Sequence, residues 1–373
     1  MNFNIISKYR ILILIIAYVA LQIFLLYQFG IVTNFEATKY IDQAHNLINT
    51  NSYTTSNFLF YSTQILLIAA CIKLKLGFWF VVMIQIAANA FSLLLFHKMV
   101  IAITKNKMVA FGATVLFLGM FYYHLYNVHL FTESLFFSFS ILFANYLFNL
   151  KKLNLATILI TVLMLAILLF TRPTGLLFIP ATLLFIIFRF GKKRALSLVF
   201  LCVTGGLILF YIILNAALNS GGEFDFLLPY IEEHVICGVP TVQHPHSITL
   251  PVNKNSVEGL WQVILNNSDL FFGLAKKRFI TFWGVRRSFF SVGHNLFIAV
   301  YFYSLYVFIF LGLKRMLTYY LPETIFILTY IFLVMLTVLL SCDEWHNRFI
   351  FSILPFLLLL AAGLFAKKKD VVS

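Results

Sequence analysis

The run ILILIIAYVALQIFLLYQFG, residues 11–30, decides the fold class of this chain. It contains no charged residue, and a helix of about 20 residues is about 30 Å long, which matches the hydrocarbon thickness of a bilayer. Similar apolar runs recur along the 373 residues, of which 62% are hydrophobic and 11% charged, against roughly 25% charged residues in a soluble domain. The chain is therefore predicted to be an all-α polytopic membrane protein.

Ten apolar runs are predicted to cross the membrane. They are residues 11–30, 78–97, 108–124, 133–150, 153–171, 174–189, 195–218, 291–313, 323–342 and 348–366. Lysines and arginines cluster between them, at 8–10, 98–107, 151–152, 189–194, 314–315 and 367–369, and ten spans place every cluster on one side. The positive-inside rule makes that side cytoplasmic, so both termini are predicted to be cytoplasmic. The compact size and the lack of a eukaryotic sorting signal favour a bacterial inner membrane.

The segment FLFYSTQILLIAACI, residues 58–72, is the competing candidate for an eleventh span. As a helix it would be only about 22 Å long, which is short for a bilayer. An extra span here would also move most later basic clusters to alternating sides. We therefore expect a juxtamembrane or re-entrant helix on the outer face.

The same topology separates charges between the two faces. The cytoplasmic face receives 16 of the 27 lysines and arginines but only two of the 13 acidic residues, Glu323 and Asp370. The net charge of +14 is thus an orientation signal and gives no support to nucleic-acid binding. Cys237 and Cys342 both fall on the outer face, where a disulfide is chemically possible.

Two long outer segments remain, and they set the predicted organisation of the chain. An N-terminal transmembrane module, 1–218, contains the first outer loop, 31–77. A second outer loop, 219–290, is too long to be a mere connector and is expected to be functional. The C-terminal helices occupy 291–373.

Ionisable residues gather at the predicted outer ends of the helices. They are Glu36 in NFEATKYIDQAHNL (34–47), Glu133 in FTESLF (131–136), Arg172 in FTRPTG (170–175), Asp343 and Arg348 in DEWHNRF (343–349), and Lys276 and Arg278 in KKRF (276–279). A charge at membrane depth costs roughly 2.5–3.5 kcal/mol, so charges kept at helix ends are functional candidates. The competing interpretation is ordinary snorkelling to water. That interpretation weakens because all five groups share one face.

Four segments resemble motifs of the GT-C glycosyltransferases. NFEATKYIDQAHNL resembles the first outer-loop signature of that family, acid-x-x-x-Tyr-x-x-x-Ala, through Glu36, Tyr40 and Ala44. FTESLFFSFSILFANYLF (131–148) resembles the family's Thr-Glu segment, LAILLFTRPTGLLFIP (165–180) its Arg-Pro helix end, and DEWHNRFIFSILPFLLLLAAGL (343–364) its closing Arg-to-Pro segment. The likeness covers roughly residues 11–218 and 341–366.

The resemblance implies a GT-C-like fold, with about ten transmembrane helices, outer juxtamembrane helices and one long outer loop. It also implies transfer, with inversion, of a sugar from a polyprenyl-phosphate donor outside the cytoplasm. Since a phosphate leaving group needs no general acid, one carboxylate that deprotonates the acceptor hydroxyl is enough, and we expect this base to be Glu36. Arginine forks bind phosphate well, so Arg172, Arg348, Lys276 and Arg278 are expected at the donor phosphate.

The remaining site residues are expected to line the substrate pocket; they are Tyr40, Glu133, His129 and Asp343. Many relatives carry paired acids at the first site, whereas Phe35 precedes Glu36 here. A single carboxylate binds a divalent cation poorly, so no metal ligand is assigned, although Glu133 could supply a second ligand for Mg²⁺ or Mn²⁺. The acceptor is expected to be a glycan, a lipid or a protein.

Two other classes of membrane protein compete with this interpretation. A transporter or lipid flippase often shows internal repeats and helices broken at matching positions, and the sequence shows neither feature. A polysaccharide polymerase would also carry outer-loop arginines, but it would lack an essential acid in the first outer loop.

Overall fold

The computed structural model describes residues 3–191, 211–212, 215, 228–239, 249 and 256–368. These residues form α-helices and short 3-10 helices and contain no strand, so the all-α prediction is confirmed for them. The chain divides into two compact units. The first unit comprises Met1–Thr182, Leu305–Thr324 and Leu354–Ser373, and the second comprises Leu183–Ser304 and Ile325–Ile353.

The first unit holds most of the N-terminal helices. They are α1 (Phe3–Phe29), α2 (Glu36–Thr50), η1 (Ser56–Tyr61), α3 (Ser62–Lys73), α4 (Gly77–Thr104), α5 (Lys107–Gly119), α6 (Phe121–Leu125), η2 (Tyr126–Val128), α7 (Glu133–Phe148), α8 (Leu155–Thr171) and η3 (Pro173–Leu177). The last 3-10 helix, η5 (Gly363–Phe365), also belongs to this unit.

The second unit contains α11 (Leu228–Ile231), α12 (Val257–Asn266) and α13 (Ser268–Gly284). Four helices contribute residues to both units: α9 (Phe178–Phe190), α14 (Val292–Tyr319), α15 (Leu321–Leu340) and α16 (Arg348–Ala362). The unit boundaries therefore follow packing, whereas the predicted boundaries at 218 and 291 followed the expected topology and stay a prediction.

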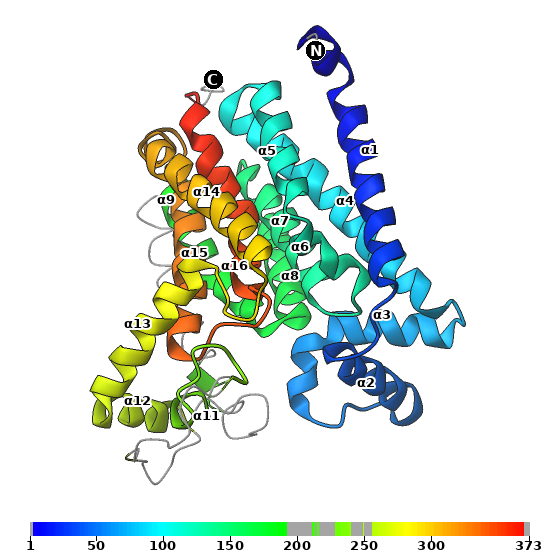
Figure 1. Cartoon of the computed structure of the whole chain (residues 1–373), viewed down its shortest axis with the longest axis vertical. Helices are drawn as coiled ribbons and strands as arrows, with labels where there is room; N and C mark the ends of the chain where they lie inside the picture. The colour runs from blue at the N-terminus through cyan, green and yellow to red at the C-terminus, as the bar shows by residue number, and fades with distance from the viewer. Residues whose placement is uncertain are drawn as a thin grey trace. The chain divides into compact units, whose positions relative to one another are not determined.

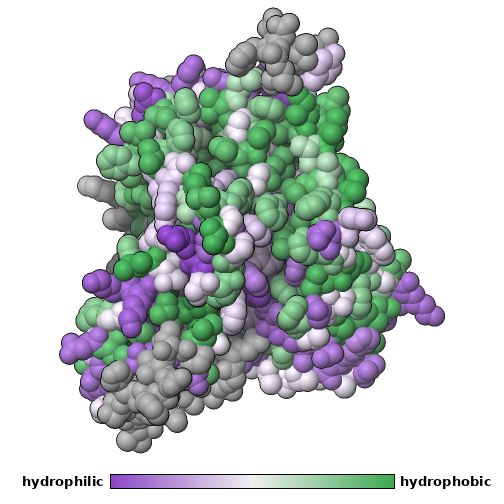
Figure 2. Space-filling model, in the orientation of Figure 1, coloured by the Kyte–Doolittle hydropathy of each residue, from purple (hydrophilic) through white to green (hydrophobic). Residues whose placement is uncertain are grey.

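Seven helices among the described residues are long and apolar enough to cross a membrane. They are Tyr9–Phe29, Ser56–Lys73, Gly77–Thr104, Pro173–Phe190, Val292–Tyr319, Leu321–Leu340 and Arg348–Phe365. Exposed apolar side chains on α1 include Ile16, Ile23 and Phe24, as lipid contact requires. Figure 2 shows hydrophobic residues over much of the drawn face and hydrophilic residues at both its upper and lower edges. The chain has the architecture of a multi-pass membrane protein, as predicted.

The predicted number of ten spans is not reached within the described residues. The span expected at 108–124 is a pair of helices, Lys107–Gly119 and Phe121–Val128, bent by 63°. Those expected at 133–150 and 153–171 are the shorter helices α7 and α8. The span expected at 195–218 lies outside the described residues, apart from 211–212 and 215.

The segment predicted to be a juxtamembrane helix, 58–72, forms η1 and α3. Together η1 and α3 cover Ser56–Lys73, and these 18 residues are long and apolar enough to cross a membrane. Figure 1 shows α3 lying crosswise to α1, and its predicted place at the outer membrane surface stays a prediction. In the first unit α3 packs against α2 and α4.

Buried amides inside α4 hold η2 and the residue that follows it in place. Gln85 is fully buried, and its Nε2 donates to the carbonyls of Tyr126, Asn127 and His129 at 3.3, 3.1 and 2.8 Å. Asn127 in turn donates to Oδ1 of Asn89 at 3.1 Å. Irregular backbone inside an apolar protein needs such partners, because no water is there to satisfy it. These amides therefore fix the segment that leads into α7.

The Gln85→Leu variant should be less stable than the wild type by about 2–4 kcal/mol. It leaves buried carbonyls short of a donor, and each such group costs about 1–3 kcal/mol. Thermal unfolding of the purified protein in detergent measures the loss. Met83→Leu changes an exposed residue of the same helix and should leave the melting temperature unchanged. Equal melting temperatures for the two variants would show that other contacts support the segment.

Candidate functional site

Glu36 stands at the first residue of α2, where the helix dipole favours a negative charge. After α1 the chain pairs briefly with the segment before α7: Val32 N–H donates to the Val128 carbonyl at 2.9 Å, and Leu130 N–H donates to the Val32 carbonyl at 3.1 Å. It then turns at Phe35, whose φ is 57°, and α2 begins. This path brings Glu36 back beside the segment that leads to Glu133.

Tyr40 and Lys39 hold the Glu36 carboxylate. The Tyr40 hydroxyl donates to Glu36 Oε1 at 2.7 Å, and Lys39 Nζ lies 3.1 Å from the same oxygen. Tyr40 is fully buried, while the Glu36 side chain is 19% exposed and accessible. Burial, the carboxylate of Glu36, Tyr61 and the carboxylate of Glu133 raise the pKa of Tyr40 well above its usual value. Tyr40 therefore stays protonated and remains a hydrogen-bond donor.

Glu133 and Arg172 form an ion pair in the same unit. Glu133 opens α7 and its side chain is completely buried; Arg172 directly follows α8 and its side chain is 12% exposed. Arg172 has extended backbone, as expected of a residue before proline. The end of α8 is fixed by a 3.0 Å hydrogen bond from Thr171 to Thr63 of α3.

Gly175 allows the sharp turn that follows Arg172. A Cβ at this position would overlap the Leu168 carbonyl oxygen, so only glycine fits without displacing the backbone of α8. The turn places Arg172 at the end of α8, where its guanidinium meets Glu133.

Four residues predicted for the site therefore form one cluster in the first unit: Glu36, Tyr40, Glu133 and Arg172. The connection between the two acids runs through Tyr40, which hydrogen bonds to Glu36 and lies within electrostatic reach of Glu133. Tyr61 packs on Tyr40 with ring centroids 5.4 Å apart. The cluster offers an accessible carboxylate, which can accept a proton, beside cations that can bind an anion. We call it the Glu36 cluster.

His129 lies on the segment held by Gln85, four residues before Glu133. Its Nδ1 is 2.9 Å from the Leu125 carbonyl, and its ring makes an edge contact with Phe131. The side chain is half-buried. The structure places His129 in the same unit as the Glu36 cluster, and its predicted role in the pocket stays a prediction.

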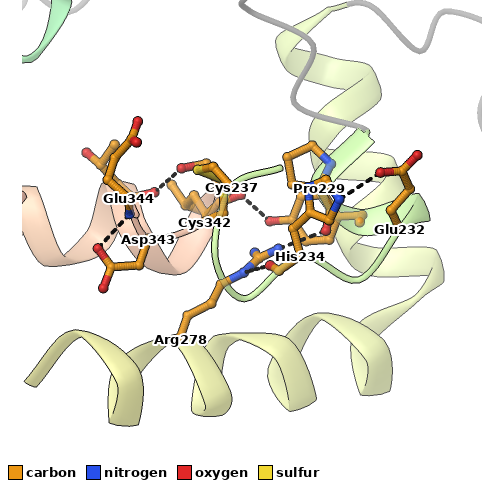
Figure 3. The surroundings of a disulfide bond; sticks show 12 residues. Pro229, Glu232, His234, Cys237, Arg278, Cys342, Asp343 and Glu344 are labelled. Carbon is orange, nitrogen blue, oxygen red and sulfur yellow. Dashed lines mark hydrogen bonds and ion pairs between the residues drawn. A yellow bond between two sulfur atoms is a disulfide. The ribbon is translucent and has the colours of Figure 1, made fainter. Parts of the chain in front are cut away.

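Arg278, expected at the donor phosphate, is bound to backbone instead (Figure 3). Its guanidinium is fully buried and donates to the carbonyls of Pro229, His234 and Leu339 at 3.0, 2.9 and 3.0 Å. It also lies 5.0 Å from the centre of the Tyr230 ring. Burial lowers the pKa of Arg278, and Tyr230 opposes this shift. These contacts give Arg278 a structural role, while Lys276 on the same helix is exposed.

A disulfide joins Cys237 to Cys342 in the second unit, so the bond considered from the sequence is present. Cys237 N–H donates to the Asp343 carbonyl at 2.8 Å, and Asp343 N–H donates to the Val235 carbonyl at 2.9 Å. The bond and these contacts clamp the turn after α11 to the loop before α16, as Figure 3 shows.

Asp343 is buried beside this disulfide and pairs with Arg287 at 2.5 Å. Burial raises the pKa of Asp343 to about 6, and Arg287 opposes the shift. Arg348 begins α16 and is half-buried. The structure thus assigns Asp343, Arg348, Lys276 and Arg278 to the second unit, and it does not join them to the Glu36 cluster.

Sequence reasoning missed several polar residues of the first unit. Gln22, Gln64, Gln85 and Asn89 are buried and linked to the segment that leads into α7. Their signal was available, because Gln85 and Asn89 are four residues apart in an otherwise apolar span and so share one helix face. No group of three or more His, Cys, Asp or Glu residues within the described ranges could hold a metal ion.

Comparison with known proteins gives no further guide: no family model, no curated protein and no solved structure matches this chain.

Proposed function

We propose that this chain is a GT-C-type glycosyltransferase that moves a sugar from a polyprenyl-phosphate donor to an acceptor hydroxyl at the outer face of a bacterial inner membrane. The observation that carries the proposal is the Glu36 cluster. Residues 36, 40, 133 and 172 were selected from three separate sequence motifs, and they lie within one unit. A chance set of charged helix ends would not be expected to meet in this way.

The chemistry needs one base and one site for the leaving group. In the proposed reaction, the acceptor oxygen attacks the anomeric carbon and the bond from that carbon to the phosphate oxygen breaks. The acceptor proton passes to Glu36, and the lipid phosphate leaves with the bond's electron pair. Because this is a single displacement, the configuration at the anomeric carbon inverts.

Arg172 is the residue that we assign to the phosphate. A guanidinium carries five N–H donors in a planar fork, so it can contact Glu133 and still present donors to a phosphate. Glu133 acts here as a positioning residue that orients the fork. Arg348 and Lys276 are retained as candidates for the same phosphate, and Arg278 is not, because backbone carbonyls occupy its guanidinium.

The proposed orientation puts both termini in the cytoplasm and the Cys237–Cys342 disulfide outside. Disulfides persist in oxidising compartments such as the bacterial periplasm and are rare in the cytosol. The disulfide is therefore consistent with the outward assignment that the basic clusters gave. The acceptor, whether glycan, lipid or protein, would then arrive from outside the cell membrane.

Turnover of defined donors tests the proposal. Purified protein in liposomes is supplied with polyprenyl monophosphates and diphosphates that carry pentoses, hexoses, deoxyhexoses and N-acetylhexosamines, together with hydroxyl acceptors. We expect transfer from at least one donor, with the anomeric configuration of the product opposite to that of the donor by NMR. Product of retained configuration, or no transfer from any donor above protein-free liposomes, would overturn the proposal.

A further inference from the structure

An apolar groove of about 250 Å³ runs between three helices of the first unit. Helix α1 supplies half of its lining, α4 supplies most of the rest, and α5 contributes Thr114. The lining is aliphatic apart from Tyr18, His97 and Thr114. The groove therefore lies along helices that are long and apolar enough to span a membrane.

His97 is the one ionisable side chain in this lining apart from Tyr18, and its hydrogen bonds fix its tautomer. The Thr114 hydroxyl has a single proton, which it donates to the Ala110 carbonyl at 2.7 Å. Thr114 Oγ1 can then only accept from His97 Nδ1, which is 2.9 Å away. Nδ1 therefore carries the proton, and Nε2 is left as an acceptor with a lone pair.

This acceptor has no partner within the described residues. His97 is only 5% exposed, and its Nε2 is buried without a hydrogen bond. The other polar groups of the groove are engaged, because the Tyr18 hydroxyl donates to the Ile86 carbonyl at 2.7 Å. A lone water at Nε2 would find no second partner among them, whereas buried waters make about three hydrogen bonds. The site fits a donor that belongs to a largely apolar molecule.

The position of His97 along α4 sets the depth of the site. Helix α4 has 28 residues, so it is about 42 Å long and exceeds a hydrocarbon core of about 30 Å. His97 lies seven residues before Thr104, the last residue of α4, and thus about 10 Å from that end. For a helix centred on the bilayer, this distance puts His97 just inside the hydrocarbon boundary. Arg10 directly precedes Ile11, a lining residue of the groove, and lies within electrostatic reach of His97.

We propose that this groove binds one anionic phospholipid whose headgroup carries a hydroxyl. An acyl chain occupies the apolar groove, Arg10 attracts the phosphate, and the headgroup hydroxyl donates to His97 Nε2. Nε2 is buried, so the hydroxyl reaches it by displacing neighbouring apolar side chains. The proposal does not rest on the transferase function.

Two lipids that differ only in headgroup donors test the proposal. Phosphatidylglycerol and phosphatidylmethanol with the same acyl chains carry the same charge, but only the first has headgroup hydroxyls. Each is added to delipidated full-length protein in detergent, and bound lipid is counted by native mass spectrometry. We expect phosphatidylglycerol to bind at least fivefold more tightly to the wild type. His97→Leu should remove that preference, and His45→Leu, which changes an exposed histidine of α2, should keep it.

Two further variants guard against misfolding of His97→Leu. Thr114→Val removes the acceptor that locks the tautomer and should weaken the preference for phosphatidylglycerol. Ala90→Phe fills the groove and should reduce binding of both lipids. Equal binding of the two lipids by the wild type would overturn the proposal. So would a preference for phosphatidylglycerol that survives both His97→Leu and Thr114→Val.

Discussion

Replacing Glu36 by glutamine should lower the rate of sugar transfer at least about 100-fold and leave the protein folded. In the wild type the Tyr40 hydroxyl donates a hydrogen bond to Glu36 Oε1 at 2.7 Å. Glutamine keeps the size of the side chain and has an oxygen that can accept the same hydrogen bond. It cannot take the acceptor's proton, and a general base typically contributes 10²–10⁴-fold to a rate. The loss should appear in kcat, while the KM for the donor changes little, because Glu36 is not assigned to the phosphate.

Two variants of α2 separate the base from other effects of charge on this helix. Glu36→Asp retains a carboxylate at a longer distance and should keep more activity than Glu36→Gln. Asp42→Asn removes an exposed acid from the same helix and should transfer sugar at the wild-type rate. If Glu36→Gln matches the wild type in kcat, another group takes the proton and the assignment of Glu36 as the general base is wrong.

Replacing Arg287 by leucine should destabilise the protein by about 3–5 kcal/mol at pH 8, and much less at pH 4. Arg287 pairs with Asp343 at 2.5 Å in a buried site, and removal of one partner leaves the other charge uncompensated. Asp343 has a folded-state pKa of about 6, above its ordinary value of 3.8, because burial disfavours the carboxylate. Protonation of Asp343 therefore stabilises the folded state. This contribution to stability is fully present below pH 4 and is lost as the pH rises through 6.

The loss of stability in Arg287→Leu should therefore depend on pH. Below pH 4 Asp343 is neutral and needs no counter-charge, so the variant recovers most of its stability relative to the wild type. Thermal unfolding at pH 4 and pH 8, followed by tryptophan fluorescence, measures the difference. Trp345 lies two residues from Asp343, and its ring makes a tilted contact with Phe289 at a centroid distance of 4.9 Å. Arg286→Leu changes the exposed neighbouring arginine and should behave as wild type at both values. A loss in Arg287→Leu that is equal at both pH values would contradict the role of the ion pair.

The apolar runs of the sequence predicted the fold class and most of the long helices, but not where helices break. The expected span 108–124 is interrupted after Gly119. Glycine is a weak helix former, yet Gly312 lies inside the unbroken α14, so a glycine alone does not distinguish the two cases. The segment that follows the break is held by Gln85, which lies 41 or more residues from the carbonyls that it binds. The sequence around Gly119 therefore does not predict that contact.

The candidate site was predictable to the extent that it is local. Glu36 and Tyr40 are four residues apart on one helix, so their hydrogen bond follows from spacing. The pairing of Glu133 with Arg172 spans 39 positions and was not predicted, although both residues were placed at helix ends. KKRF misled the prediction for Arg278, because successive residues of a helix point in different directions. Lys276 faces solvent while Arg278 is buried against carbonyls.

The amides buried in α4 bear on how the chain enters the membrane during synthesis. If α4 moved into lipid alone, Gln85 would stand without the carbonyls that it binds, and these belong to a segment made 41 to 44 residues later. At 5–20 residues per second, the ribosome makes that segment about 2–9 s afterwards. We therefore expect α4 to remain beside the insertion machinery until α5, α6 and η2 have emerged. The N-terminal helices would then leave for the bilayer as a group, with their polar contacts already formed.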